Sequence, residues 1–148
     1  MNYIDGALLL IGSPKIKYST SESLGQYLLD RLVQNKFNSE IIHVLNALKS
    51  QESINEMVYS INNSSVIILA SPLYVDCLPA PVIKMMEITN IIRNNKSFTN
   101  RPKFIALINS GFPESSHNNV ALNICKIFCE SSNLEWLGGI GIGAGGAI

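Results

Sequence analysis

The segment from residue 12 to residue 21 carries residue types that bind phosphate. It reads GSPKIKYSTS and leads directly into a helical pattern that begins near Glu22. Free backbone N–H groups and the positive end of the helix dipole meet at the start of such a helix, and together they attract an anion. The segment therefore predicts a site for a phosphate dianion. Four hydroxyl side chains could complete it: Ser13, Ser19, Thr20 and Ser21.

The same segment also fits a plain helix start. Ser19 and Glu22 have the spacing of a capping box, in which both side chains serve only the helix. The loop by itself leaves both interpretations open. It lacks the Gly-Lys-Ser/Thr ending of a nucleoside-triphosphate loop and the GxGxxG pattern of a dinucleotide fold. A formal GxGxxG match at Gly141, Gly143 and Gly146 leaves only two residues for the helix that this motif needs.

Two later segments have a similar character. Residues 71–79 contain prolines that stiffen the chain around Tyr74, and residues 109–114 place the flexible Gly111 beside Phe112. Stiff loops with an aromatic side chain suit a flat ligand, although Tyr74 equally fits an aromatic at the rim of a fold. Asp76 equally fits a residue that caps a turn. Neither segment identifies its ligand alone.

Short apolar runs without polar alternation predict strands that are covered on both faces. They lie at residues 7–11, 41–45, 66–70 and 104–108. A fifth strand is expected around residues 136–142. Apolar residues recur at helical spacing in four segments between the strands: 24–32, 54–61, 82–92 and 120–128. This alternation predicts a parallel sheet with helices on both faces, a three-layer α/β fold, in which ligands bind at the carboxyl ends of the strands.

Length and charge exclude several classes of protein. A chain of 148 residues has the length of one domain, so we expect residues 1–148 to form a single unit. Eleven basic residues balance eleven acidic ones, which removes the field that would gather nucleic acid or an anionic membrane surface. The apolar run at residues 7–11 is much shorter than the roughly 20 residues of a membrane span. We expect neither nucleic acid nor a membrane as a partner.

The cysteines and histidines show no catalytic or metal-binding pattern. Cys77, Cys125 and Cys129 lack the spacing of a disulfide framework or a zinc site, so we expect no metal and a cytoplasmic, reducing location. Cys125 and Cys129, one helical turn apart, are expected to be core thiols. His43 falls within a predicted strand, and His117 lies in the first turn of a predicted helix. No arrangement of a nucleophile with its base is recognisable, and we assign no catalytic residue.

Together the three loops resemble the flavin-binding loops of NADPH-dependent FMN reductases and related flavodoxin-fold oxidoreductases. The matching residues are Gly12-Ser13-Pro14-Lys15, Ser19-Thr20-Ser21 with Leu24, Pro72-Leu73-Tyr74-Val75-Asp76, and Asn109-Ser110-Gly111-Phe112. The resemblance covers nearly the whole chain and implies a flavodoxin-like fold with a five-stranded parallel sheet in the order 2-1-3-4-5. It also implies FMN as cofactor and NADPH or NADH as co-substrate.

The resemblance also implies a role for each loop. The residues that would hold the FMN phosphate are Ser13, Ser19, Thr20 and Ser21, with Lys15 as a neutralising charge. Those that would border the flavin ring are Pro72, Leu73, Tyr74 and Val75. Those that would close the site are Asn109, Ser110, Gly111 and Phe112. The implied reaction moves a hydride from NAD(P)H to the flavin and on to a small-molecule acceptor, with the chemistry carried by the flavin.

The sequence departs from this family in one respect. The family continues past a glycine-rich fifth strand into a final helix, which is missing here. Either the chain is cut short or another subunit covers that face, as in a homodimer. The alternative function is a flavodoxin-like electron-transfer protein without a nicotinamide site, but such proteins are strongly acidic and this chain is balanced. A third interpretation is a binding or scaffold protein with the same fold.

Overall fold

Five parallel strands form one sheet at the centre of the protein, in a computed structural model that describes residues 6–14 and 19–143. The strands are β1 (Gly6–Ile11), β2 (Asn38–His43), β3 (Val66–Pro72), β4 (Lys103–Asn109) and β5 (Glu135–Ile142). Their order across the sheet is β2-β1-β3-β4-β5, and every neighbouring pair is parallel. The predicted strand order is therefore confirmed.

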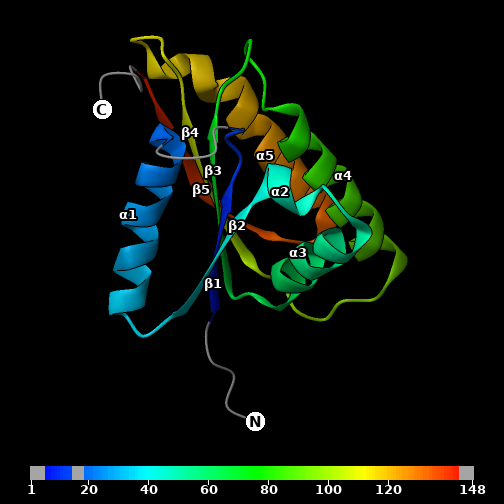
Figure 1. The fold of residues 1–148 in the computed structure, drawn as a ribbon. Helices are drawn as coiled ribbons and strands as arrows, with labels where there is room; N and C mark the ends of the chain where they lie inside the picture. The colour runs from blue at the N-terminus through cyan, green and yellow to red at the C-terminus, as the bar shows by residue number, and fades with distance from the viewer. Residues whose placement is uncertain (1–5, 15–18, 144–148) are drawn as a thin grey trace.

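Helices cover both faces of this sheet (Figure 1). Among the described helices, α1 (Thr20–Gln34) alone lies on one face. The other face carries α2 (Val44–Ala47), α3 (Gln51–Asn63), α4 (Ala80–Asn95) and α5 (Asn119–Ser132), and the 3₁₀ helix η1 (Ser115–Asn118) leads into α5. The predicted three-layer α/β architecture is confirmed. Within the described part of the chain, no helix has both the length and the apolar character to cross a membrane.

Two apolar clusters, one on each side of the sheet, hold the layers together. Residues of β1 divide between them, because successive side chains of a strand point to opposite faces. Leu8 and Leu10 belong to the cluster under α2 to α5, whereas Leu9 and Ile11 belong to the cluster under α1. All four side chains are fully buried, and the residues of β3 before Pro72 are buried as well. Burial on both faces explains why these central runs show no polar alternation.

The prediction of a doubly covered strand at residues 41–45 is wrong in its bounds and its burial. The strand is β2, and Val44 and Leu45 already belong to α2. Ile41 is 42% exposed. Among the described strands, β2 pairs only with β1, so it lies at the edge of the described sheet and has a neighbour on one side. An apolar run shows only that a segment is hydrophobic. Whether that segment is buried depends on how many helices and strands pack around it.

The start of α1 is held close to the carboxyl ends of β1 and β3. Gly25 makes this possible, because a Cβ at this position would lie 2.5 Å from Leu9 Cδ1 and 2.9 Å from the Cβ of Ala70. Without a side chain, α1 packs directly on the sheet. The first turn of α1 is thereby placed beside the loop that follows β1.

Candidate functional site

Three loops meet at the carboxyl edge of the sheet, where a pocket of about 250 Å³ opens. They follow β1, β3 and β4, which are the central strands of the sheet. The lining residues are Ser13, Ser19, Thr20, Ser21, Pro72, Leu73, Tyr74, Asn109, Ser110 and Gly111. All of them are site residues expected from the sequence, and the structure brings them together from three distant segments. None carries a formal charge at neutral pH, so the lining does not repel an anion.

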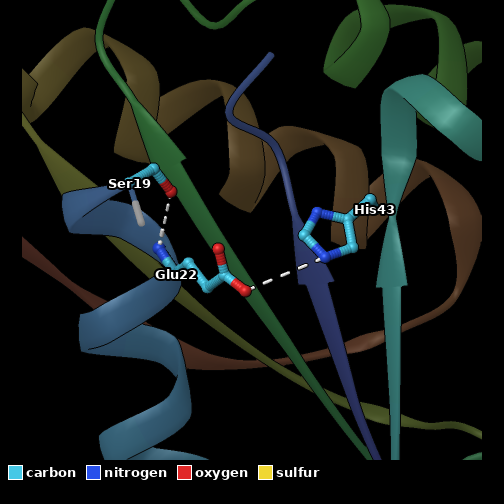
Figure 2. Close-up of polar contacts among 3 residues, drawn as sticks. All are labelled: Ser19, Glu22 and His43. Atoms are coloured by element: carbon cyan, nitrogen blue, oxygen red, sulfur yellow. Dashed lines mark hydrogen bonds and ion pairs between the residues drawn. The ribbon is translucent and has the colours of Figure 1, made fainter. Parts of the chain in front are cut away.

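Ser19 caps α1, as its spacing from Glu22 predicted. Its Oγ accepts a hydrogen bond of 3.0 Å from the backbone N–H of Glu22 (Figure 2). Ser19 is buried, and its backbone is extended, as expected at the start of a helix. The bond uses a lone pair of the hydroxyl oxygen, so the O–H group can still donate to a ligand. Capping and anion binding are therefore compatible at this residue.

The Glu22 side chain points toward His43 (Figure 2). Glu22 Oε1 lies 3.9 Å from His43 Nε2, and the two side chains are 32% and 31% exposed. His43 is the last residue of β2 and pairs in register with Ile11 of β1. Sequence reasoning missed this contact, because the strand order alone does not show how α1 packs over β1 and β2. The contact involves the acidic residue of the first turn of α1, next to the candidate anion site.

A buried hydrogen bond joins the start of α1 to the end of β4. Ser21 Oγ donates to Asn109 Oδ1 at 2.6 Å, and both residues are more than nine-tenths buried. The backbone oxygen of Asn109 accepts a hydrogen bond of 2.8 Å from the N–H of Leu73, in the loop after β3. Asn109 therefore ties all three loops together. Asn109 lines the pocket, and its Nδ2 amide group can donate hydrogen bonds to a ligand.

A tight turn shapes the loop after β3. Tyr74 and Cys77 exchange two backbone hydrogen bonds of 2.6 and 2.9 Å. Between them, Val75 (φ 47°) and Asp76 (φ 60°) adopt left-handed conformations, which strain a β-branched residue by roughly 1–3 kcal/mol. Tyr74 lines the pocket, whereas Val75 is 98% exposed. The turn therefore directs Val75, expected from the sequence beside the ligand, into solvent.

The loop after β4 contributes a buried hydroxyl. Ser110 Oγ has no hydrogen-bond partner among the described residues, although Ser110 is almost fully buried. Its backbone N–H extends the pairing with β5 by donating to the oxygen of Ile142 at 2.9 Å. A buried polar group without a partner costs about 1–3 kcal/mol. A ligand in the pocket that offers an acceptor or a donor to Ser110 would remove this cost.

Phe112, expected from the sequence to close the site, is not among the residues that line the pocket. Its ring stacks against His117, with ring centroids 4.5 Å apart, and its side chain is half exposed. His117 belongs to η1 and its Nε2 lies 3.5 Å from Glu114 Oε2. Lys15, the expected neutralising charge, lies outside the described residues.

Cys125 and Cys129 lie on the buried face of α5, as core thiols. Burial raises the pKa of each thiol to about 12. Both therefore stay protonated at neutral pH, and a protonated thiol is a poor nucleophile and metal ligand. Over residues 6–14 and 19–143, no group of three His, Cys, Asp or Glu side chains is placed to hold a metal ion.

Comparisons with known proteins agree with this geometry. The profile of a family described as NADPH-dependent FMN reductase matches residues 7–129, which include all three loops. A search of curated proteins gives no significant match.

Solved structures share the fold at low sequence identity. An apo NADH:FMN oxidoreductase is 18% identical, with a TM-score of 0.74 over 95% of this chain and 76% of that chain. RosB with bound 8-demethyl-8-formylriboflavin-5′-phosphate is 10% identical, with a TM-score of 0.72 over 89% and 61% of the two chains. A flavodoxin, WrbA-like protein from Agrobacterium tumefaciens is 10% identical, with a TM-score of 0.68 over 90% and 76%. These likenesses confirm the flavodoxin-like fold.

Proposed function

Because the chain belongs to the NADPH-dependent FMN reductase family, we propose that it passes a hydride from NADPH or NADH through FMN to a small-molecule acceptor. Membership of this family makes it an NAD(P)H-dependent oxidoreductase with FMN as cofactor. The observation that carries the proposal is the pocket at the carboxyl edge of the sheet. Its uncharged lining, rich in hydroxyl groups, lies beside the start of α1.

The first loop suits the phosphate of FMN. Ser13, Ser19 and Thr20 bring hydroxyl groups to the pocket, and the backbone N–H groups of the first turn of α1 lie beside them. Such groups bind a phosphate through charge-assisted hydrogen bonds, and the helix dipole adds a partial positive charge. Among the described residues, no acidic side chain lines the pocket to oppose this binding. We therefore place the phosphate here.

The other two loops suit the remainder of the cofactor. The pocket of about 250 Å³ is smaller than the roughly 300–1,000 Å³ of sites that enclose a whole ligand. We therefore assign it the phosphate and sugar-alcohol chain, with Tyr74 bordering the ring at the mouth and Asn109 and Ser110 as hydrogen-bonding groups. Bound FMN supplies the hydride chemistry. The side chains bind and orient it, and none has to act as an acid, a base or a nucleophile.

We also propose that residues 1–148 act as one domain in a reducing cytoplasm. Support for one domain comes from the single sheet, which contains strands from residue 6 to residue 142. Support for the compartment comes from the cysteines Cys77, Cys125 and Cys129, which are free thiols.

An FMN titration followed by anaerobic reduction tests the proposed reaction. We expect the chain to quench the fluorescence of added FMN as it binds. Anaerobic addition of NADPH, and separately of NADH, is then expected to bleach the visible absorbance of the bound flavin on a catalytic timescale. Binding without bleaching would support an electron-transfer protein without a nicotinamide site, and failure to bind FMN would overturn the proposal.

Ser21→Ala is expected to weaken the binding of FMN and of riboflavin alike, each by about 5–10-fold. The reason is that Ser21 Oγ donates a hydrogen bond to Asn109 Oδ1. Loss of this hydroxyl is therefore expected to affect flavin binding by changing the orientation of the Asn109 amide. If Ser21 instead contacts the phosphate directly, as the resemblance implied, Ser21→Ala would weaken the binding of FMN only, because riboflavin has no phosphate. Fluorescence titrations with the two flavins measure both factors.

Ser23→Ala is the matched control, because Ser23 lies in the same turn of α1 but is exposed. We expect it to bind both flavins like the unaltered chain. Asn109→Ala and the double variant of Ser21 and Asn109 complete the comparison. If Ser21 acts through Asn109, the double variant binds FMN no more weakly than Asn109→Ala alone. Additive losses would contradict this coupling.

A further inference from the structure

A second pocket, of about 500 Å³, lies between α3 and α4. The residues that line it are Asn55, Val58, Tyr59, Asn62, Asn63, Ile92, Lys96 and Phe98. Most of them lie near the C-terminal ends of the two helices, and α3 ends only two residues before β3 begins. The pocket is therefore near the amino ends of the strands, across the molecule from the candidate flavin site. Its volume falls within the roughly 300–1,000 Å³ typical of small-molecule sites.

A buried cation lies directly behind this pocket. Arg93 is 5% exposed, and its guanidinium group lies 4.7 Å from the ring centre of Phe98, which forms part of the pocket wall. Its hydrogen bonds go to three backbone oxygens and one side-chain amide oxygen. Within the described part of the chain, no carboxylate forms an ion pair with it. Its positive charge is therefore not cancelled by a formal negative charge.

Hydrogen bonds outside the pocket orient two of the asparagine amides that line it. Arg93 Nη1 donates to Asn62 Oδ1 at 3.0 Å, and Gln51 Nε2 donates to Asn55 Oδ1 at 2.9 Å. Arginine can only donate, so it must meet the oxygen of Asn62. With both oxygens occupied, the Nδ2 groups of Asn55 and Asn62 are left as donors for a ligand. Asn63 differs, because its Nδ2 donates to the backbone of its own helix.

The remaining lining combines one positive charge with an apolar surface. Lys96 is exposed, and none of the ion pairs found among the described residues includes it. Val58, Ile92 and Phe98 supply aliphatic and aromatic surface. No aspartate or glutamate from residues 6–14 or 19–143 lines the pocket. A ligand that complements this positive charge and apolar surface is flat, apolar over most of its area, and negatively charged at one end.

We propose that the pocket between α3 and α4 binds a planar aromatic carboxylate. The carboxylate group accepts hydrogen bonds from the Lys96 ammonium and from the amides of Asn55 and Asn62. The aromatic ring packs against Phe98 and Ile92. This binding does not depend on the flavin site, because the two pockets share none of their described lining residues.

Titration of the full chain with 2-naphthoate tests the proposal, with 2-naphthamide as the uncharged probe of the same shape. We expect 2-naphthoate to bind at least about 10-fold more tightly than 2-naphthamide, because the charge strengthens each hydrogen bond it accepts. Calorimetry measures both affinities. Saturating FMN is expected to leave them unchanged, and displacement of the probe by FMN would place it in the other pocket and overturn the assignment.

Two substitutions separate this site from nonspecific binding. Lys96→Gln is expected to weaken the binding of 2-naphthoate about 5–10-fold. Asn55→Asp is expected to weaken it at least about 10-fold, because the new carboxylate has the same negative charge as the probe. Both positions are exposed, so the fold should be retained. Lys49→Gln is the control, because Lys49 is an exposed lysine that does not line the pocket. Absence of binding at millimolar 2-naphthoate, equal affinity for the two probes, or equal effects of Lys96→Gln and Lys49→Gln would each overturn the proposal.

Discussion

Ser13→Asp is expected to weaken FMN binding by at least about 100-fold. Ser13 lines the pocket and is only 6% exposed, so a carboxylate there would lie close to the phosphate. Two unit charges about 4 Å apart, at an effective dielectric constant of ~20, repel each other by roughly 4 kcal/mol. A phosphate monoester carries more than one negative charge, which increases the repulsion. Fluorescence titration of the variant with FMN measures the loss.

Riboflavin and two further variants make this test specific. Riboflavin lacks the phosphate, so its affinity is expected to fall far less. Ser23→Asp places the same charge on the exposed side of the first turn of α1 and is expected to change FMN affinity by less than about threefold, because solvent and salt screen it. Thr20→Asp repeats the test at the first residue of α1, where an acidic side chain favours the helix. Folded variants at Ser13 and Thr20 that keep full FMN affinity would contradict the phosphate site.

Arg93→Met is expected to lower the free energy of unfolding by about 3–5 kcal/mol. The acceptors of its guanidinium, at 2.7 to 3.2 Å, are the backbone oxygens of Asn100, Ser132 and Asn133 and Oδ1 of Asn62. They join α3, the loop before β4 and the end of α5, where a cation also favours the helix dipole. Methionine fills similar space but leaves these oxygens without their donor. For a chain of this length the expected fall in Tm is about 6–20 °C.

Urea and thermal unfolding of Arg93→Met, Arg93→Lys and Arg31→Met test this role. Burial lowers the pKa of Arg93, so the fold holds this cation against a desolvation cost. Arg93→Lys keeps a positive charge but has fewer hydrogen-bond donors. Its loss of unfolding free energy is therefore expected to lie between those of Arg31→Met and Arg93→Met. Arg31 is exposed and contacts the ring of Tyr27 on its own helix, so Arg31→Met should cost less than about 1 kcal/mol. A cost below about 1 kcal/mol for Arg93→Met would show that water replaces the guanidinium at these oxygens.

The central strands could be predicted from the sequence, and the edge strand could not. Unbroken apolar runs marked β1, β3 and β4 correctly, because a strand with neighbours on both sides and helices above and below buries most of its side chains and therefore consists mainly of apolar residues. The run at residues 41–45 has the same composition but meets a different environment. Its first part lies in β2 at the sheet edge, and its last two residues begin α2. Hydrophobic pattern alone does not distinguish these positions.

The residues around the candidate site could be predicted as loops, but their contacts could not. Each loop follows a central strand, so the rule for parallel sheets placed all three at one edge. The hydrogen bond between Ser21 and Asn109 forms only when α1 and β4 pack at the right distance from each other, so no local sequence pattern predicts it. The left-handed turn at Val75 and Asp76 was also missed, since the β-branched Val75 disfavours that conformation, although an aspartate adopts it more readily.

By itself, the sequence determined the succession of strands and helices, the loops that carry hydroxyl, proline and aromatic residues, and the family to which those loops belong. These properties depend on residues close together in the chain, whose spacing is preserved whatever the final packing. The tertiary structure alone decided which hydroxyls face the pocket, which donate to one another, and where the Arg93 guanidinium finds its acceptors. Side-chain partners are set by the distances between elements that lie far apart in sequence, and only the packed sheet and helices define those distances.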